Sequence, residues 1–149
     1  LYVNSSARFE CTPTMLRHDN RGKCLFTKGM AYGKSVMIPC AHGEGKLMFE
    51  KKKEQKLLDR LQDNDQIVFR YVDEEGRAAG YPWCPNGSLS NIAGICNPAG
   101  NVMGMMPHPE RVFHRYTHPD FTRSGDNPNN AGDGRAIFES VVDLVARKN

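Results

Sequence analysis

The most informative stretch of the chain is residues 101–111, which read NVMGMMPHPER. Its first six residues are mostly apolar and predict a buried strand. The strand is expected to end at the first proline, because neither proline can donate a hydrogen bond to a neighbouring strand. His108 lies between the two prolines, so it is expected at the exit of the strand with few backbone conformations open to it.

The residues before this stretch predict its partner strands. Residues 92–97 are largely apolar, and residues 98–100, Pro-Ala-Gly, can join them to 101–106 as a short hairpin. Residues 66–72 are rich in β-branched and aromatic side chains and predict a further strand, which a turn at 73–76 would end.

Farther from this hairpin, residues 35–41 form an apolar run between turn residues and predict a buried strand, and 46–49 are expected to resume as a strand. Residues 52–62 place three leucines on one stripe and predict a helix. A last helix is expected to begin near Asp133, a good cap. The residues of this helix predicted to face inward are Ile137, Val141, Leu144 and Val145.

Two stretches are expected to be irregular, a loop at 82–90 and residues 120–134, which are rich in Asn, Asp, Gly and Pro. Strands and helices otherwise mix along the chain, with a hairpin in the middle, which indicates an α/β domain with antiparallel additions. A length of 149 residues corresponds to one domain with one core. Hydrophobic content of 39% and charged content of 25% are typical of soluble globular proteins.

The composition argues against membrane and nucleic-acid partners. No apolar run approaches the roughly 20 residues of a membrane helix, and the first residues lack the pattern of a signal peptide. The formal charge of +3 is mild, and the basic residues do not gather into one face. Because the first segment reads like the middle of a domain and does not start with Met, the chain is expected to be a fragment or a processed piece.

The five cysteines lie at positions 11, 24, 40, 84 and 96, an odd number without CxxC spacing. This pattern argues against a disulfide framework and against a structural zinc cluster. Free thiols in a reducing cytoplasm are the simplest expectation.

His108 and Glu110 form a candidate catalytic pair. Over two residues of extended or turn backbone, the carboxylate can reach the imidazole, fix its tautomer and stabilise the imidazolium during proton transfer. This is two thirds of a nucleophile–His–acid arrangement. A His-x-Glu pair is also common on protein surfaces, so the spacing alone leaves its role open.

Five segments resemble, in the same order, those of class I glutamine amidotransferases, and in particular the glutaminase component of phosphoribosylformylglycinamidine synthase. The resemblance runs from about residue 8 to the terminal helix, and the short tail after Glu110 looks like that of the free-standing small subunit. The segments are 41–46 (AHGEGK), 69–73 (FRYVD), 85–88 (PNGS), 91–95 (NIAGI) and 105–111 (MMPHPER).

The resemblance implies that the chain takes part in hydrolysing glutamine to supply ammonia for purine biosynthesis. It makes His108 the general base and Glu110 its orienting partner, both serving a cysteine thiolate that attacks the side-chain amide of glutamine. It also implies a loop that faces the substrate or a partner protein. The residues of this loop are His42, Gly43, Glu44 and Gly45.

The resemblance further implies a three-layer, flavodoxin-like α/β domain, of which residues 1–149 would be the incomplete C-terminal part with antiparallel hairpin additions. The expected partners are glutamine, a formylglycinamide ribonucleotide synthetase subunit and an upstream half of the same domain. The chain itself is expected to hold no cofactor and no metal, since ATP and magnesium would bind to the synthetase.

The nucleophile of the family belongs to a Gly-x-Cys-x-Gly turn upstream of every matched segment, and none of the five cysteines has that context. Cys96 follows a glycine in GICN, but a hairpin turn follows it instead of a helix. It would pair near Val102, roughly 20 Å from His108 at ~3.4 Å per strand residue, which is too far for catalysis. Cys40 is expected to be a core thiol. The chain alone is therefore expected not to hydrolyse glutamine.

Two other interpretations stay open. One is a zinc site, whose ligands would be His108, Glu110, His114 and His118. The other is a non-catalytic fragment or interaction module that docks on a synthetase subunit, with the irregular residues 117–133 at the contact.

Overall fold

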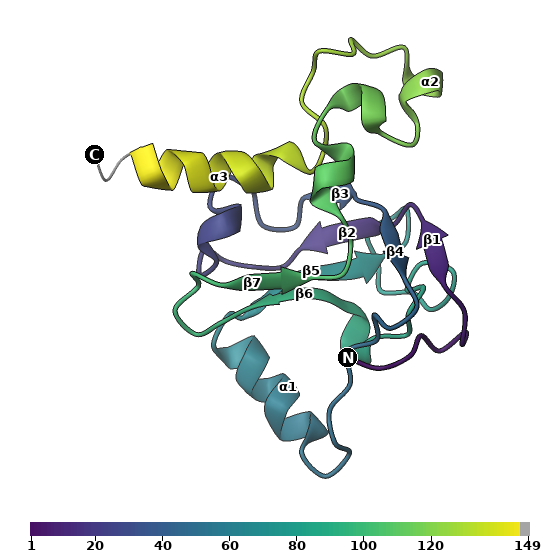
Figure 1. The fold of residues 1–149 in the computed structure, drawn as a ribbon. Helices are drawn as coiled ribbons and strands as arrows, with labels where there is room; N and C mark the ends of the chain where they lie inside the picture. The colour runs from purple at the N-terminus through teal and green to yellow at the C-terminus, as the bar shows by residue number, and fades with distance from the viewer. Residues whose placement is uncertain (147–149) are drawn as a thin grey trace.

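The computed structural model describes residues 1–146 and shows a five-stranded sheet with a helix on each face, together with a separate two-stranded sheet (Figure 1). The strands are β1 (Glu10–Thr12), β2 (Met15–His18), β3 (Ser35–Met37), β4 (Cys40–His42), β5 (Ile67–Val72), β6 (Ile92–Cys96) and β7 (Met103–Met105). The α-helices of this part of the chain are α1 (Glu54–Asp63), α2 (Phe121–Ser124) and α3 (Arg135–Ala146). The 3-10 helices are η1 (Leu25–Thr27), η2 (Leu89–Asn91), η3 (Pro109–Val112) and η4 (Arg115–Thr117). Among these described helices, none is long and apolar enough to cross a membrane.

The larger sheet has the order β3-β2-β5-β6-β7, and each of these pairings is antiparallel. The strand predicted over 66–72 is the central strand β5, and the predicted hairpin is β6–β7, in which Ile95 lies opposite Gly104. Both predictions are confirmed, as is the mixed α/β class. The antiparallel part is larger than the additions expected from the sequence, because β2 and β3 belong to it as well.

The single strand predicted over 35–41 is wrong. The stretch is divided into β3 and β4, which belong to different sheets. Pro39 lies at the division and has no N–H to continue a ladder, whereas the N–H of Ile38 still donates to the carbonyl of Thr14 (3.0 Å). The strand predicted at 46–49 is wrong too, since only its first residue, Lys46, forms a bridge in the described structure, with Tyr2.

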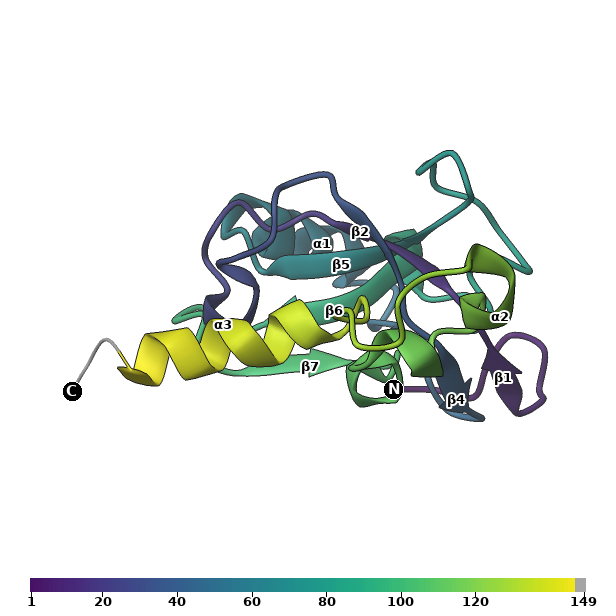
Figure 2. The same ribbon diagram turned by 90° about the horizontal axis from the view of Figure 1, so that it is seen from above.

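The main core lies on the face of the larger sheet that α3 covers (Figures 1 and 2). Leu16, Phe69 and Tyr71 are fully buried in one hydrophobic cluster that includes Ile137 of α3. Inward orientation is confirmed for Ile137, while Val141 and Leu144 are half-buried. The prediction is wrong for Val145, whose exposed fraction is 56%, because it lies on the outer side of the helix.

Asp133 precedes α3, near the position where a cap was predicted. Its carboxylate accepts a hydrogen bond from the backbone N–H of Met37 in the edge strand β3 (2.7 Å). The residue therefore links the start of α3 to the sheet that the helix covers.

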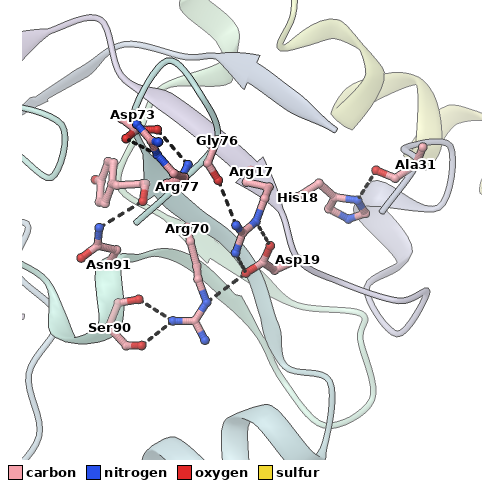
Figure 3. Close-up of polar contacts among 11 residues, drawn as sticks. Arg17, His18, Asp19, Ala31, Arg70, Asp73, Gly76, Arg77, Ser90 and Asn91 are labelled. Atoms are coloured by element: carbon pink, nitrogen blue, oxygen red, sulfur yellow. Dashed lines mark hydrogen bonds and ion pairs between the residues drawn. The ribbon is translucent and has the colours of Figure 1, made fainter. Parts of the chain in front are cut away.

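The opposite face of the sheet carries a charged network (Figure 3). Arg17 and Arg70 are opposite one another on β2 and β5, and like charges in this position repel. Asp19 lies between them, with 2.6 Å from Arg17 Nε to Oδ1 and 3.0 Å from Arg70 Nε to Oδ2. The shared carboxylate therefore offsets the repulsion. Helix α1 lies on this face and has no buried residue.

Candidate functional site

His108 is held in place through its backbone. Its N–H donates to the carbonyl of Pro39 (2.7 Å), and the neighbouring Pro107 forms a bridge with Cys40 of β4. Pro39 has no N–H to donate, but its carbonyl accepts this bond from a distant part of the chain. The exit of β7 is thereby fixed against the start of β4.

The turn after His108 is fixed from its other side by residues 132–134. The N–H of Gly134 donates to the carbonyl of Val112 (3.0 Å), and Val112 is fully buried in the core. A Cβ on Gly134 would collide with the backbone of Pro109, so only glycine permits this close approach. The backbone that carries His108 and Glu110 is therefore clamped between β4 and the segment that leads into α3.

The side chains of His108 and Glu110 form the contact predicted from the sequence. Nδ1 of His108 lies 2.9 Å from Oε1 of Glu110. Because a carboxylate only accepts hydrogen bonds, Nδ1 carries the proton and donates it, which leaves the lone pair of Nε2 free. The exposed fractions of the side chains are 34% for His108 and 57% for Glu110, so the pair is open to an approaching group. Chemically, this arrangement is an oriented general base.

The His42–Gly45 loop lies beside this pair but turns its histidine inward. His42 is buried, and its Nδ1 lies 3.1 Å from Oδ1 of Asn4. Burial lowers the pKa of His42, and a charge on the nearby His108 acts in the same direction. Gly45 packs directly on the His42 ring, where a Cβ would collide. Glu44 is exposed, so it and the loop backbone are the parts of the loop that can face a ligand or a partner.

Two buried asparagines that hold this loop were not singled out from the sequence. Asn4 donates through Nδ2 to the carbonyl of His42 (2.7 Å) and accepts the N–H of Gly45 (3.1 Å). Asn86 donates to the carbonyl of Gly45 (2.8 Å) and to the hydroxyl of Tyr71 (3.1 Å). The segment with Asn86 was noted as part of the expected loop and as one of the segments that resemble the family, but no local pattern indicated that either amide reaches a loop some forty residues away in sequence.

All five cysteines are free and lie within the described residues, and four of them are buried. Cys40 is fully buried, which confirms that it is a core thiol. Cys96 pairs with Met103 at the turn end of the β6–β7 hairpin. Met103 precedes His108 by five residues, which corresponds to roughly 17 Å along a strand. Burial raises its pKa to about 11, which disfavours the thiolate. These findings agree with the expectation that Cys96 is not the nucleophile. Cys11 is exposed.

The four residues of the alternative zinc site do not converge. Within residues 1–146, no group of three or more His, Cys, Asp or Glu side chains has the arrangement of a metal site. His114 stacks on Tyr116, with ring centroids 5.0 Å apart. His118 is buried, and its Nδ1 accepts the N–H of Asp120 (3.1 Å). At the spacing of His114 and His118, a helix would place both side chains on one face, but the structure has only the single 3-10 turn η4 between them, and the two histidines flank it.

Comparison with known proteins places this arrangement in a family context. Residues 1–145 match the model of the CobB/CobQ-like glutamine amidotransferase domain. A phosphoribosylformylglycinamidine synthase subunit PurQ from Archaeoglobus fulgidus is 52% identical over 147 residues, covering 99% of this chain and 51% of the relative. A PurQ subunit from Picrophilus torridus is 46% identical over 141 residues, covering 93% of this chain and 51% of the relative.

A solved structure of PurLQS from Thermotoga maritima contains a chain with the same fold. The TM-score is 0.67 at 29% identity, and the match covers 97% of this chain and 52% of that chain. This chain thus spans about half the length of the curated relatives that it matches. The family match covers nearly all of its residues, and the chain therefore belongs to the CobB/CobQ-like glutamine amidotransferase family.

Proposed function

We propose that this chain is part of the glutaminase of phosphoribosylformylglycinamidine synthase, which hydrolyses glutamine and supplies ammonia for purine biosynthesis. The observation that carries the proposal is the 2.9 Å contact between His108 and Glu110 on a backbone clamped from both sides. Membership of the amidotransferase family and the PurQ names of the relatives support the same substrate, glutamine.

In the proposed reaction, Nε2 of His108 removes the proton from a cysteine thiol, and the thiolate attacks the side-chain carbonyl carbon of glutamine. Glu110 accepts the Nδ1 proton in a hydrogen bond throughout and stabilises the imidazolium. The imidazolium returns its proton to the leaving nitrogen, so that ammonia departs and a glutamyl thioester remains. The same Nε2 then activates water, which hydrolyses the thioester to glutamate and regenerates the thiol.

The attacking thiol is proposed to come from the part of the relatives' fold that this chain does not span. Four of the five cysteines are buried, and the exposed Cys11 lies in the middle of β1 rather than at a sharp strand-to-helix turn. A buried thiol in the core cannot meet a substrate. An upstream half of the domain is therefore a required partner in this proposal.

A synthetase subunit is the other proposed partner, since the solved relative comes from a PurLQS assembly. The synthetase would bind formylglycinamide ribonucleotide, ATP and magnesium, and would consume the ammonia. Five free thiols are compatible with a reducing compartment, and we place the reaction in the cytoplasm.

The test is to co-express the full chain with the upstream part of the Archaeoglobus fulgidus PurQ and to measure glutamate release. His108→Ala should lower the rate by roughly 10³-fold, and Glu110→Gln by roughly 10²-fold. Cys11→Ser is the matched control and should leave the rate unchanged. The proposal fails if the assembled protein hydrolyses no glutamine, or if His108→Ala retains the full rate.

A non-catalytic docking module is the second candidate function, favoured by the burial of four of the five thiols. In that case a synthetase subunit would retain the chain in a pull-down, and deleting residues 117–133 would abolish retention. Glutamate release with the upstream half present would exclude this candidate.

A further inference from the structure

A polar pocket lies where β2 ends, beside η1 and the loop that joins the two. Its volume is about 400 Å³, which is within the range of small-molecule sites. Its walls include His18, Asn20, Arg21, Thr27, Lys28 and Tyr32. We call it the His18 pocket. Neither member of the candidate catalytic pair lines it, so it is a separate feature of the molecule.

Two buried polar atoms in the walls of this pocket lack a hydrogen-bond partner. They are Nε2 of His18 and Oγ1 of Thr27, on residues with exposed fractions of 1% and 2%. The other ring nitrogen of His18 is bonded, since Nδ1 lies 3.1 Å from the carbonyl oxygen of Ala31 (Figure 3). Buried polar atoms in proteins are nearly all paired. Three side-chain atoms of residues 1–146 are exceptions, and two of them belong to this pocket.

The two atoms require a partner that can donate a hydrogen bond. Because a carbonyl only accepts, Nδ1 of His18 carries the proton, and burial lowers the pKa of His18, which favours the neutral ring. Nε2 therefore offers a lone pair, whereas the hydroxyl of Thr27 can both donate and accept. A ligand hydroxyl satisfies either atom.

The rim of the pocket is positively charged. Arg21 and Lys28 line it, and no Asp or Glu does. Among the described residues, neither cation forms an ion pair. A neighbouring pocket, in contrast, is lined by Asp19, Asp63 and Asp65. The His18 pocket is therefore suited to an anionic group at its mouth and repels an ammonium group.

The backbone of the rim is held in shape by Asn20. Its Oδ1 accepts the N–H groups of Gly22 (3.2 Å) and Cys24 (2.8 Å), and its Nδ2 donates to the carbonyl of Asp65 (2.6 Å). The loop that carries Arg21 is thus fixed before any ligand binds. The charged side chains of the rim are exposed, and exposed side chains change rotamer within nanoseconds. A ligand can therefore reach the covered atoms deeper in the pocket.

We propose that the His18 pocket binds a small hydroxylated phosphate ester of the sugar phosphate class. Its hydroxyl groups would bond to His18 and Thr27, and its phosphate would bind to Arg21 and Lys28. A phosphate monoester carries nearly two negative charges at neutral pH, which matches two cations, whereas a carboxylate carries only one. A single water, at about 30 Å³, would fill only a small part of the volume. The proposal does not depend on the proposed glutaminase function.

The first experiment is titration calorimetry of the purified full chain with ribose 5-phosphate, inorganic phosphate and ribose. One molecule of ribose 5-phosphate is expected to bind per chain. Inorganic phosphate should bind at least about 10-fold more weakly, because it reaches the cations of the rim but not the two deeper atoms. Ribose should bind more weakly than ribose 5-phosphate by a similar factor, because it lacks the charge.

The second experiment repeats the titration with ribose 5-phosphate on three variants. Thr27→Val preserves the size of the side chain and should weaken binding about 10-fold. It should not lower the urea midpoint, since the hydroxyl has no partner in the folded chain. Lys28→Ala changes an exposed side chain and should also weaken binding about 10-fold. The matched control is Lys34→Ala, an exposed lysine that does not line the pocket, and it should bind like the parent.

The inference would be overturned if ribose 5-phosphate does not bind, or if Thr27→Val or Lys28→Ala keeps full affinity. Equal affinity for inorganic phosphate would indicate an adventitious ion only, and weaker binding by Lys34→Ala would indicate attraction by overall charge. A crystal structure with ribose 5-phosphate that shows only a water on Nε2 of His18 would contradict it as well. None of these measurements involves glutamine, so their outcome is independent of the glutaminase test.

Discussion

The two faces of the five-stranded sheet differ in how completely the chain covers them. On the α3 face, Leu16, Phe69 and Tyr71 are fully buried in one cluster with Ile137. On the α1 face there are a charged network, an open apolar groove and a helix without a buried residue. The chain therefore buries a continuous hydrophobic cluster on the α3 face, while the α1 face is less completely covered.

Strand alternation explains how one sheet carries both kinds of face. Neighbouring residues point to opposite sides, so Leu16 enters the core while Arg17 points away from it, and Tyr71 enters the core while Arg70 points away. His108 lies at the boundary between the faces, since Val112 behind it enters the core and Met106 before it lines the groove. The backbone of the candidate site is thus held against the core, while the side chains of His108 and Glu110 remain accessible from outside.

The sharpest test of the comparison removes a large side chain from each face. Phe69→Ala on the covered face should reduce the free energy of unfolding by about 3–5 kcal/mol, because it leaves a cavity in a packed core. Ile95→Ala on the groove face should cost only about 1 kcal/mol, since Ile95 is already half-exposed. Urea unfolding of both variants checks this, and equal losses would show that the faces do not differ.

Substitutions in the charged network of Arg17, Asp19 and Arg70 should have the next largest effect on the free energy of unfolding. Asp19→Asn leaves Arg17 and Arg70 facing each other without a shared carboxylate and should cost about 2–3 kcal/mol. Glu75→Gln breaks an exposed ion pair with Arg77 and should change stability by less than about 0.5 kcal/mol. A shift in urea midpoint no larger for Asp19→Asn than for Glu75→Gln would contradict the structural role of the network.

Removing the side chain of Asn86, which holds the loop around Gly45, should lower the free energy of unfolding by a smaller amount. Asn86→Ala loses the bonds to the carbonyl of Gly45 and to the hydroxyl of Tyr71 and should cost about 2 kcal/mol. Hydrogen exchange should rise at residues 42–46 more than in β5, because the loop loses its anchor. Uniform exchange across the chain would mean that Asn86 supports the whole fold rather than this loop.

The smallest expected effect is a pH dependence that comes from the buried histidine next to the core. Burial lowers the pKa of His18 from 6.5, so the unfolded chain binds a proton more readily than the folded chain. The contribution of His18 to stability is therefore complete above about pH 6.5 and falls as the pH decreases, by at most about 1.4 kcal/mol per pH unit. His18→Gln should flatten the change in urea midpoint between pH 7.5 and 5.5, and an unchanged slope would contradict this assignment.

Local patterns were sufficient where neighbouring residues in sequence act together. The apolar runs around Pro98 and Gly100 predicted the hairpin, and the spacing of His108 and Glu110 predicted a contact that the structure has at 2.9 Å. The strand over 35–41 was wrong because apolar content alone does not indicate that Pro39 sends the two halves to different sheets. The predicted inward orientation of Val145 was wrong because α3 has apolar residues on both sides, so its sequence does not indicate which side faces the core.

The residue pattern was enough to predict the α/β class, the strand over 66–72, the β6–β7 hairpin and the contact between His108 and Glu110, since each depends on residues a few positions apart. Three features become apparent only in the folded chain: the face of the sheet that is covered, the bond from His108 to the carbonyl of Pro39, and the hydrogen bonds by which Asn4 and Asn86 hold the loop around Gly45. These features depend on contacts between segments far apart in the chain, whose geometry is set by packing and by the need to satisfy buried polar groups, and no local pattern encodes them.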